Sequence, residues 1–301
     1  MIMHKSRSPA LKSKARLFAA IGLAVVASTQ AVAQVGSRSR REVVDANAYP
    51  WSSIGKIGNS VGGQCTGAVI GANQFLTAAH CLYYKAVRRL LPAEAIHLLL
   101  GYVRDEYRVH RVASKYVMSP TYDAPVEDRA RPDDWVVLYV SDPFPPDIKP
   151  LVLADAVSPV GTAVKAAGYA RERRYMMTAD QHCRIEVALS DARLFRHGCL
   201  IEPGDSGGPV LGAHASEEGL IVGINVAVLV LGPKRAAPRN EDFWGGIAVS
   251  AASIKAFLSR QRDRARPRKT CGSQGPRRPR PALARLFLRP TSTVAEAASP
   301  L

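Results

Sequence analysis

Gly204-Asp205-Ser206-Gly207-Gly208-Pro209 places a serine among three glycines, about two thirds of the way along a 301-residue chain. Glycines on both sides of Ser206 allow the backbone to form a tight turn in which N–H groups converge beside the serine hydroxyl. A serine hydroxyl is a weak nucleophile at neutral pH, so it needs a neighbouring base to take its proton. The run therefore indicates a serine nucleophile, and a base for it is expected elsewhere in the chain.

Two further segments carry residues suited to this chemistry. The segment Phe75-Leu76-Thr77-Ala78-Ala79-His80-Cys81 offers an imidazole, which titrates near neutral pH and can act as a base and then as an acid. The segment Asp133-Asp134-Trp135-Val136-Val137-Leu138 offers a carboxylate directly before an apolar run. Taken singly, a histidine beside small residues or an aspartate before a strand is more often structural. Only the combination of the three segments indicates a catalytic site.

Together, the three segments resemble the trypsin-like serine peptidases of the chymotrypsin fold, and the secreted bacterial members in particular. The similarity covers residues 43–258, and the motifs occur in the family's order of histidine, aspartate and serine. The resemblance implies that His80 is the general base, that Asp134 orients it and that Ser206 is the nucleophile. It further implies an oxyanion hole formed by the backbone N–H groups of Gly204 and Ser206.

Asp133 competes with Asp134 for the third role. The family's aspartate directly precedes an apolar strand, which favours Asp134, the residue before Trp135. The implied function is a secreted serine endopeptidase that works through an acyl-enzyme, with polypeptides as its substrates. The alternative is a non-catalytic binding module or a surface adhesin on the same fold. An esterase is disfavoured, because an α/β-hydrolase places its histidine after the serine in the chain.

The fold class follows from short apolar or alternating runs that recur between Gly, Pro, Asp and Asn, a spacing that predicts an all-β barrel or sandwich. These runs are residues 53–57, 66–70, 97–100, 135–140, 163–167, 208–211 and 220–224. The resemblance narrows this class to two six-stranded antiparallel β-barrels with the active site in the cleft between them. A short C-terminal helix is expected to be capped by Ser250 and to reach Leu258, with Ile254, Phe257 and Leu258 on one face.

The resemblance also assigns four of the five cysteines. It implies one disulfide between Cys65 and Cys81 and a second between Cys183 and Cys199, and it leaves Cys271 without an obvious partner. A metal site is disfavoured, because the chain has no Cys-x-x-Cys motif and no paired histidines at metal-binding spacing. No metal and no cofactor are expected.

Substrate preference depends on the segment before the nucleophile. Leu200 stands six residues before Ser206, where trypsin itself has the acidic floor of its primary specificity (S1) pocket. An apolar floor would favour an apolar side chain at the cleaved position over lysine or arginine. Glu202 and Pro203 alter this segment relative to the family, so the alignment of Leu200 stays a hypothesis.

The net charge of +16 is confined to the two ends of the chain. Residues 1–33 contribute five positive charges, residues 34–41 three and residues 261–301 eight, so the middle of the chain is neutral. A nucleic-acid partner is therefore not expected for the catalytic domain. The Arg/Pro-rich tail over residues 261–301 is expected to be disordered, with at most weak contact to anionic surfaces. The protein is expected to be a monomer.

The N-terminal 33 residues have the layout of a secretory signal. A basic stretch ends at Arg16, an apolar segment spans residues 17–27, and Ala31-x-Ala33 provides the small residues of a cleavage site. Cleavage near Ala33 would place the protein outside the cell or in the periplasm, where disulfides form. An uncleaved membrane anchor is the alternative.

Residues 34–42 form a basic linker or a short pro-segment ahead of the peptidase domain, residues 43–260. In this family, cleavage typically exposes a new N-terminus that pairs with the aspartate before the nucleophile, here Asp205. The sequence Arg40-Arg41-Glu42-Val43 only partly matches such a cleavage site, because Glu42 separates the basic pair from Val43. Secreted bacterial relatives often need no cleavage, so activation near Arg41 stays open at this point.

Overall fold

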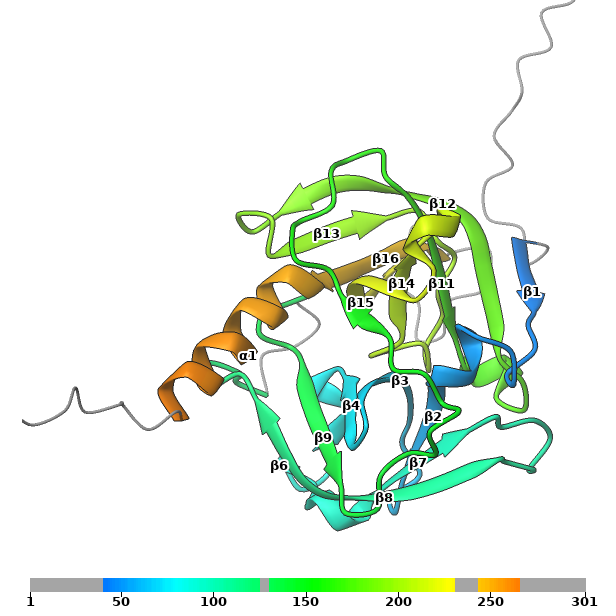
Figure 1. Ribbon diagram of the computed structural model, residues 1–301, viewed down its shortest axis with the longest axis vertical. Coiled ribbons are helices and arrows are strands. Elements are labelled where there is room, and N and C mark those ends of the chain that lie inside the picture. Colours follow the sequence, from blue (N-terminus) through cyan, green and yellow to red (C-terminus); the bar gives the residue numbers. More distant parts are fainter. Residues whose placement is uncertain (1–39, 125–129, 231–242, 266–301) are drawn as a thin grey trace, which may run out of the picture.

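The computed structural model describes residues 40–124, 130–230 and 243–265, in which most of the regular secondary structure is β-strand (Figure 1). The predicted signal segment over residues 1–33, Cys271 and nearly all of the basic tail lie outside these described residues. Within the described residues, no helix is long and apolar enough to cross a membrane.

Six antiparallel strands close into the first barrel. In order around the barrel they are β2 (Ile54–Asn59), β3 (Gln64–Gly71), β4 (Gln74–Thr77), β9 (Val136–Val140), β8 (Val109–Met118) and β7 (Ile96–Leu100). Alternation along β7 buries Ile96, Leu98 and Leu100 in the barrel. Burial of one such leucine stabilises the fold by about 1.5–3 kcal/mol.

Six further antiparallel strands form the second barrel, which the pairing of β12 with β13 closes. They are β12 (Thr178–Leu189), β11 (Ala163–Gly168), β14 (Pro209–Gly212), β15 (Leu220–Val230), β16 (Phe243–Ser250) and β13 (Leu194–His197). A short strand, β10 (Val152–Leu153), pairs in parallel with β15. The predicted all-β fold of two six-stranded antiparallel barrels is therefore confirmed.

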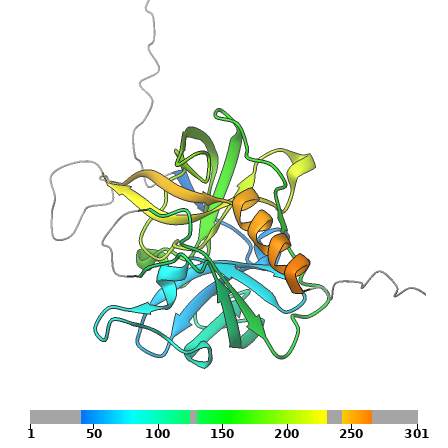
Figure 2. The same ribbon diagram turned by 90° about the vertical axis from the view of Figure 1, so that its left-hand side faces the viewer.

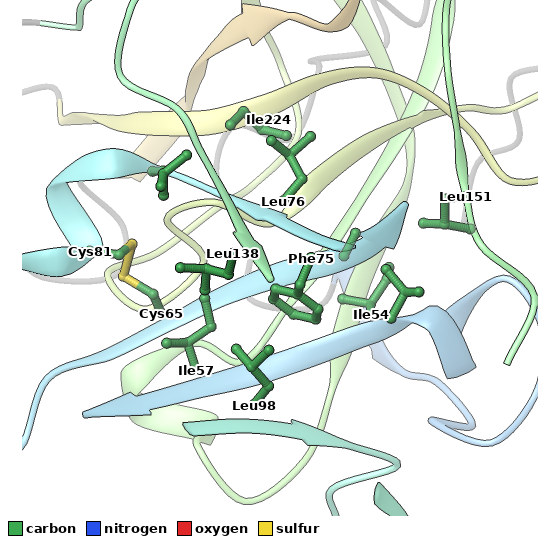
Figure 3. Close-up of a cluster of buried hydrophobic side chains, with 14 of the residues drawn as sticks. Ile54, Ile57, Cys65, Phe75, Leu76, Cys81, Leu98, Leu138, Leu151 and Ile224 are labelled. Atoms are coloured by element: carbon green, nitrogen blue, oxygen red, sulfur yellow. A yellow bond between two sulfur atoms is a disulfide. The ribbon is translucent and has the colours of Figure 1, made fainter. Parts of the chain in front are cut away.

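Two clusters of buried side chains form the core. The larger cluster fills the first barrel and continues to Ile224 and Ile254 in the second half of the chain (Figure 3). The smaller cluster lies inside the second barrel around Phe195, Val210 and Val222. Apolar packing is therefore continuous between the two halves.

Helix α1 (Ala251–Ala265) follows β16 directly and extends from the second barrel toward the first (Figure 2). Ile254 is fully buried, and the Phe257 ring meets the Trp135 ring edge-on at a centroid distance of 5.1 Å. The predicted apolar face therefore packs as expected. The helix continues past the expected end at Leu258, because no glycine or proline interrupts residues 259–265.

A short strand, β1 (Arg41–Val43), pairs with β12 at the edge of the second barrel, where Figure 1 shows the two strands side by side. Residues 34–42 were expected to be a linker or pro-segment ahead of the domain. The last residues of that segment instead belong to the folded body, because Arg41 is buried there.

Candidate active site

The histidine segment runs from the end of β4 into a short 3-10 helix, η3 (Ala79–Leu82). A disulfide joins Cys65 of β3 to Cys81 of η3 (Figure 3). The Thr77 hydroxyl donates to the Thr66 carbonyl at 2.8 Å, which fixes the chain just before η3. His80 is thus held at the end of the first barrel, with 36% of its side chain exposed.

Asp134 precedes β9 and binds His80 through both of its carboxylate oxygens. Its Oδ2 lies 2.7 Å from His80 Nδ1, and its Oδ1 accepts the His80 backbone N–H at 2.9 Å. The residue is 6% exposed, so the carboxylate is shielded from water. Asp134, and not Asp133, therefore occupies the orienting position that the sequence motif left between two candidates.

The charge balance around His80 raises the pKa of its imidazole above the ordinary value of 6.5. Burial pulls this pKa down, but the charge of Asp134 and its hydrogen bond to the ring outweigh burial. The Lys85 ammonium opposes protonation and lowers the pKa. With Nδ1–H directed at Asp134, His80 presents its other ring nitrogen, Nε2, as the basic atom.

The turn that carries Ser206 contains two backbone N–H groups that no atom of the described residues accepts. The N–H groups of Asp205, Gly207 and Gly208 donate to carbonyl oxygens of the protein. Those of Gly204 and Ser206 have no hydrogen-bond partner among the described residues. Gly204 and Gly207 have φ values of 106° and 78°, in the left-handed region that glycine adopts without strain.

Close packing brings the serine turn against the histidine segment. A Cβ atom on Gly207 would collide with Thr77 and Ala78, so only glycine allows this approach. Cys81 Sγ lies 3.7 Å from the Ser206 carbonyl oxygen, which itself accepts the Thr66 N–H at 2.9 Å. Among the described residues, the Ser206 hydroxyl makes no hydrogen bond.

A comparison with known protein families identifies the fold family of the chain. A family model described as Trypsin matches residues 39–243. The chain belongs to the trypsin family. It is 28% identical to the serine protease SP24D of Anopheles gambiae over 166 residues. The matched region covers 49% of this chain and 58% of that protein. This trypsin-family chain thus spans little more than half the length of that relative.

The architecture is also that of a solved structure, described as Glu endopeptidase in complex with MPD. That structure superposes with a TM-score of 0.56 and 19% sequence identity, over 76% of this chain and 98% of the other. At this identity the likeness shows the shared fold alone. The second disulfide, between Cys183 and Cys199, lies within the second barrel of this trypsin-family chain. Both disulfides are the pairs that the resemblance implied.

Leu200 lies buried in the segment before the serine turn. The residue is 3% exposed, and its backbone N–H donates to Asp180 Oδ2 at 2.8 Å. Its carbonyl oxygen accepts a hydrogen bond from Arg41 at 2.9 Å. Leu200 as the floor of the primary specificity pocket stays a prediction.

Arg41 is the residue near the site that sequence reasoning missed. Its guanidinium forms a buried ion pair with Asp205, the neighbour of Ser206. The basic pair Arg40-Arg41 was interpreted as linker or cleavage site, because dibasic runs are usually exposed. The only sequence signal for the contact was Asp205, a carboxylate in a glycine turn that needs a cationic partner when buried.

Cys65, Cys81 and His80 bring possible metal-ligand atoms within 4.8 Å of one another. The two sulfur atoms are joined as a disulfide, so neither is available as a thiolate ligand. The cluster therefore supports the structure of the histidine segment and does not make a metal centre.

Proposed function

We propose that the chain is a secreted serine endopeptidase that hydrolyses peptide bonds through an acyl-enzyme. The observation that carries the proposal is the Asp134–His80 pair held beside a serine turn in which two N–H groups find no acceptor within the described part of the chain. A base oriented by a carboxylate, a serine beside it and free N–H donors are the parts that acyl transfer requires.

The first half of the reaction forms the acyl-enzyme. Ser206 Oγ attacks the substrate carbonyl carbon while its proton passes to His80 Nε2. The carbonyl oxygen becomes an oxyanion, which the N–H groups of Gly204 and Ser206 receive. Collapse of this intermediate breaks the C–N bond, and the imidazolium of His80 gives its proton to the leaving amine.

The second half repeats the sequence with water as nucleophile, which releases the carboxylic acid product and restores Ser206. Asp134 keeps the His80 proton on Nδ1 and stabilises the imidazolium in both halves. Each oxyanion donor contributes roughly 3–4 kcal/mol of transition-state stabilisation in enzymes of this kind.

An extracellular or periplasmic location is part of the proposal. The two disulfides need an oxidising compartment, and the N-terminal segment has the layout of a cleaved secretory signal. The substrates are polypeptides, and Leu200, as the floor of the primary specificity pocket, would favour apolar side chains at the cleaved position. Faster cleavage of arginine peptides than of phenylalanine or leucine peptides would contradict that preference.

Labelling with a fluorophosphonate probe, which reacts with activated serines, tests the proposal. Wild type should be labelled, Ser206→Ala should not, and Ser114→Ala should label like wild type because Ser114 lies on the exposed face of β8. A wild type that resists the probe would favour the non-catalytic binding module. Labelling retained in Ser206→Ala would refute Ser206 as the nucleophile.

A further inference from the structure

Arg41 is held in the protein interior by every donor it has. Its side chain is 1% exposed, and its five N–H bonds are all used. Nε and Nη2 donate to the hydroxyl and carbonyl of Thr178 at 3.0 Å, and Nη1 donates to the Leu200 carbonyl at 2.9 Å. The two remaining bonds reach both carboxylate oxygens of Asp205. The surrounding acceptors therefore match all five N–H bonds of an arginine side chain at this position.

The carboxylate that receives Arg41 lies inside the serine turn. Asp205 stands between Gly204 and Ser206, whose N–H groups are the two unpaired donors, and it is fully buried. Its Oδ2 also accepts the Glu202 N–H at 2.8 Å, which closes the turn from the other side. The orientation of the Asp205 side chain therefore sets the orientation of the peptide groups on both sides of it.

Removing Arg41 would leave the buried Asp205 carboxylate without its cationic partner, with the Glu202 N–H as its remaining donor. A buried charge without a partner either moves toward water or takes up a proton, and both outcomes disturb the backbone that carries it. Burial alone would lower the pKa of the Arg41 guanidinium, but the carboxylates of Asp205, Glu202 and Asp180 outweigh burial and raise it. The guanidinium is therefore the charged partner of Asp205 in the folded protein.

Arg40, the neighbour of Arg41, contacts the start of the segment that precedes the turn. Its Nη2 lies 2.9 Å from Asp180 Oδ2 and 3.0 Å from the Gly198 carbonyl oxygen. The same Asp180 oxygen accepts the Leu200 N–H. The two consecutive arginines thus form hydrogen bonds with both ends of the segment from Gly198 to Asp205, which lies more than 150 positions later in the sequence.

We propose that Arg41 is the positioning residue that holds the Gly204–Ser206 turn in its active geometry, and that cleavage after Arg41 switches the peptidase off. The proposal rests on the proposed function. In the intact chain Arg41 is the first residue of β1 and is joined through Glu42 to the rest of the domain, which keeps its effective concentration at Asp205 high. A cut between Arg41 and Glu42 would convert this contact into one with a separate peptide, which dissociates. A new N-terminus at Glu42 or Val43 would have to replace a guanidinium that makes five hydrogen bonds.

The N-terminus of the active molecules gives the first test. Wild-type protein is labelled with the fluorophosphonate probe, and the labelled fraction alone is isolated and sequenced from its N-terminus. We expect labelled chains to begin before Arg41, so that Arg41 is still joined to Glu42. Labelled chains that begin at Glu42 or Val43 would overturn the inference and leave the proposed function intact. Failure of wild type to label at all would refute both.

Substitution of Arg41 gives the second test, read as kcat and KM separately. Arg41→Met should lower kcat about 100-fold with little change in KM, because the oxyanion donors act mainly in the transition state. Arg41→Lys should recover part of this loss. In Arg41→Ala, millimolar guanidinium should restore part of kcat, which lost stability alone would not allow.

A matched control separates positioning from stability. Leu98→Ala removes a buried side chain of the first barrel and should lower the melting temperature while kcat below the transition stays at the wild-type value. A folded Arg41→Met with wild-type kcat would overturn the proposal. If Arg41→Met does not fold, the proposal is tested by the N-terminal sequence of labelled wild type and by the kcat of Arg41→Lys. A wild-type kcat in Arg41→Lys would also overturn the proposal.

Discussion

At the scale of single residues, the chemistry depends on how His80 is held. Asp134 uses one carboxylate oxygen on the ring and the other on the His80 backbone, so the imidazole can neither rotate nor move away. The same carboxylate raises the pKa of His80 against the effect of burial. In the proposed mechanism the base must be neutral to accept the Ser206 proton, so we expect activity to be lost as the pH falls through this raised pKa.

Asp134→Asn should lower kcat by about 10⁴-fold, the size of the loss that the corresponding change causes in trypsin. The amide leaves the shape of the contact but favours the wrong tautomer of His80. Steady-state kinetics on a peptide substrate measure the effect. Asp133→Asn is the matched control and should change kcat by no more than a few-fold. A large loss in Asp133→Asn and a small one in Asp134→Asn would reverse the assignment.

Lys85→Met should move the acid limb of the pH profile of kcat/KM to higher pH. The Lys85 ammonium opposes protonation of His80, so its removal raises the pKa of the free-enzyme base. Lys115→Met removes an exposed cation that lies over the Tyr139 ring, and it should leave the profile unchanged. A shift of the acid limb to lower pH in Lys85→Met would contradict the account.

At the scale of elements, the two disulfides close loops of the same sequence separation, 16 residues, but in different barrels. The Cys65–Cys81 bridge holds η3 and therefore His80, whereas the Cys183–Cys199 bridge holds the second barrel. Their equal loops make the pair a natural comparison, because the loss of chain constraint on removal is the same for both.

Replacing both cysteines of either pair with serine should lower the free energy of unfolding by about 3 kcal/mol. Urea unfolding of the two double variants measures this loss. Only the Cys65/Cys81 variant should also lose kcat under conditions where both are folded, because it frees the histidine segment. Equal kcat values in the two variants would show that the first bridge does not position His80.

The apolar runs of the sequence predicted seven of the strands, among them β9 and β15, which are rich in buried apolar residues. Strands β8 and β12 were not indicated, because outward-facing polar residues such as Ser114, Lys115 and Gln181 interrupt their apolar pattern. The glycine turn and the histidine segment were recognisable because their chemistry is local. The Arg41–Asp205 contact joins residues 164 positions apart, and no local pattern records such a pair.

At the scale of the whole molecule, a buried histidine links stability to pH. His197 in β13 is fully buried, and its Nε2 lies 2.9 Å from Asn225 Oδ1, while Nδ1 has no partner among the described residues. Burial lowers the pKa of His197 to about 4 from an ordinary value of 6.5. The unfolded chain therefore binds one more proton than the folded chain between these two values.

The free energy of unfolding should fall by about 3 kcal/mol as the pH drops from 6.5 to 4, and this contribution should not fall further below pH 4. Urea unfolding at a series of pH values measures it in wild type and in His197→Gln, which should lose most of this slope. His182→Gln removes an exposed histidine of β12 and should keep the slope. An unchanged slope in His197→Gln would contradict the assignment.

Hydrolysis of a mixed peptide library tests the central claim most directly. Wild type, Ser206→Ala and Ser114→Ala are incubated with the library, and the products are identified by mass spectrometry. Wild type and Ser114→Ala should cut internal peptide bonds at equal rates, and Ser206→Ala should be slower by several orders of magnitude. No cleavage by wild type, or equal cleavage by Ser206→Ala, would contradict a serine endopeptidase built on His80, Asp134 and Ser206.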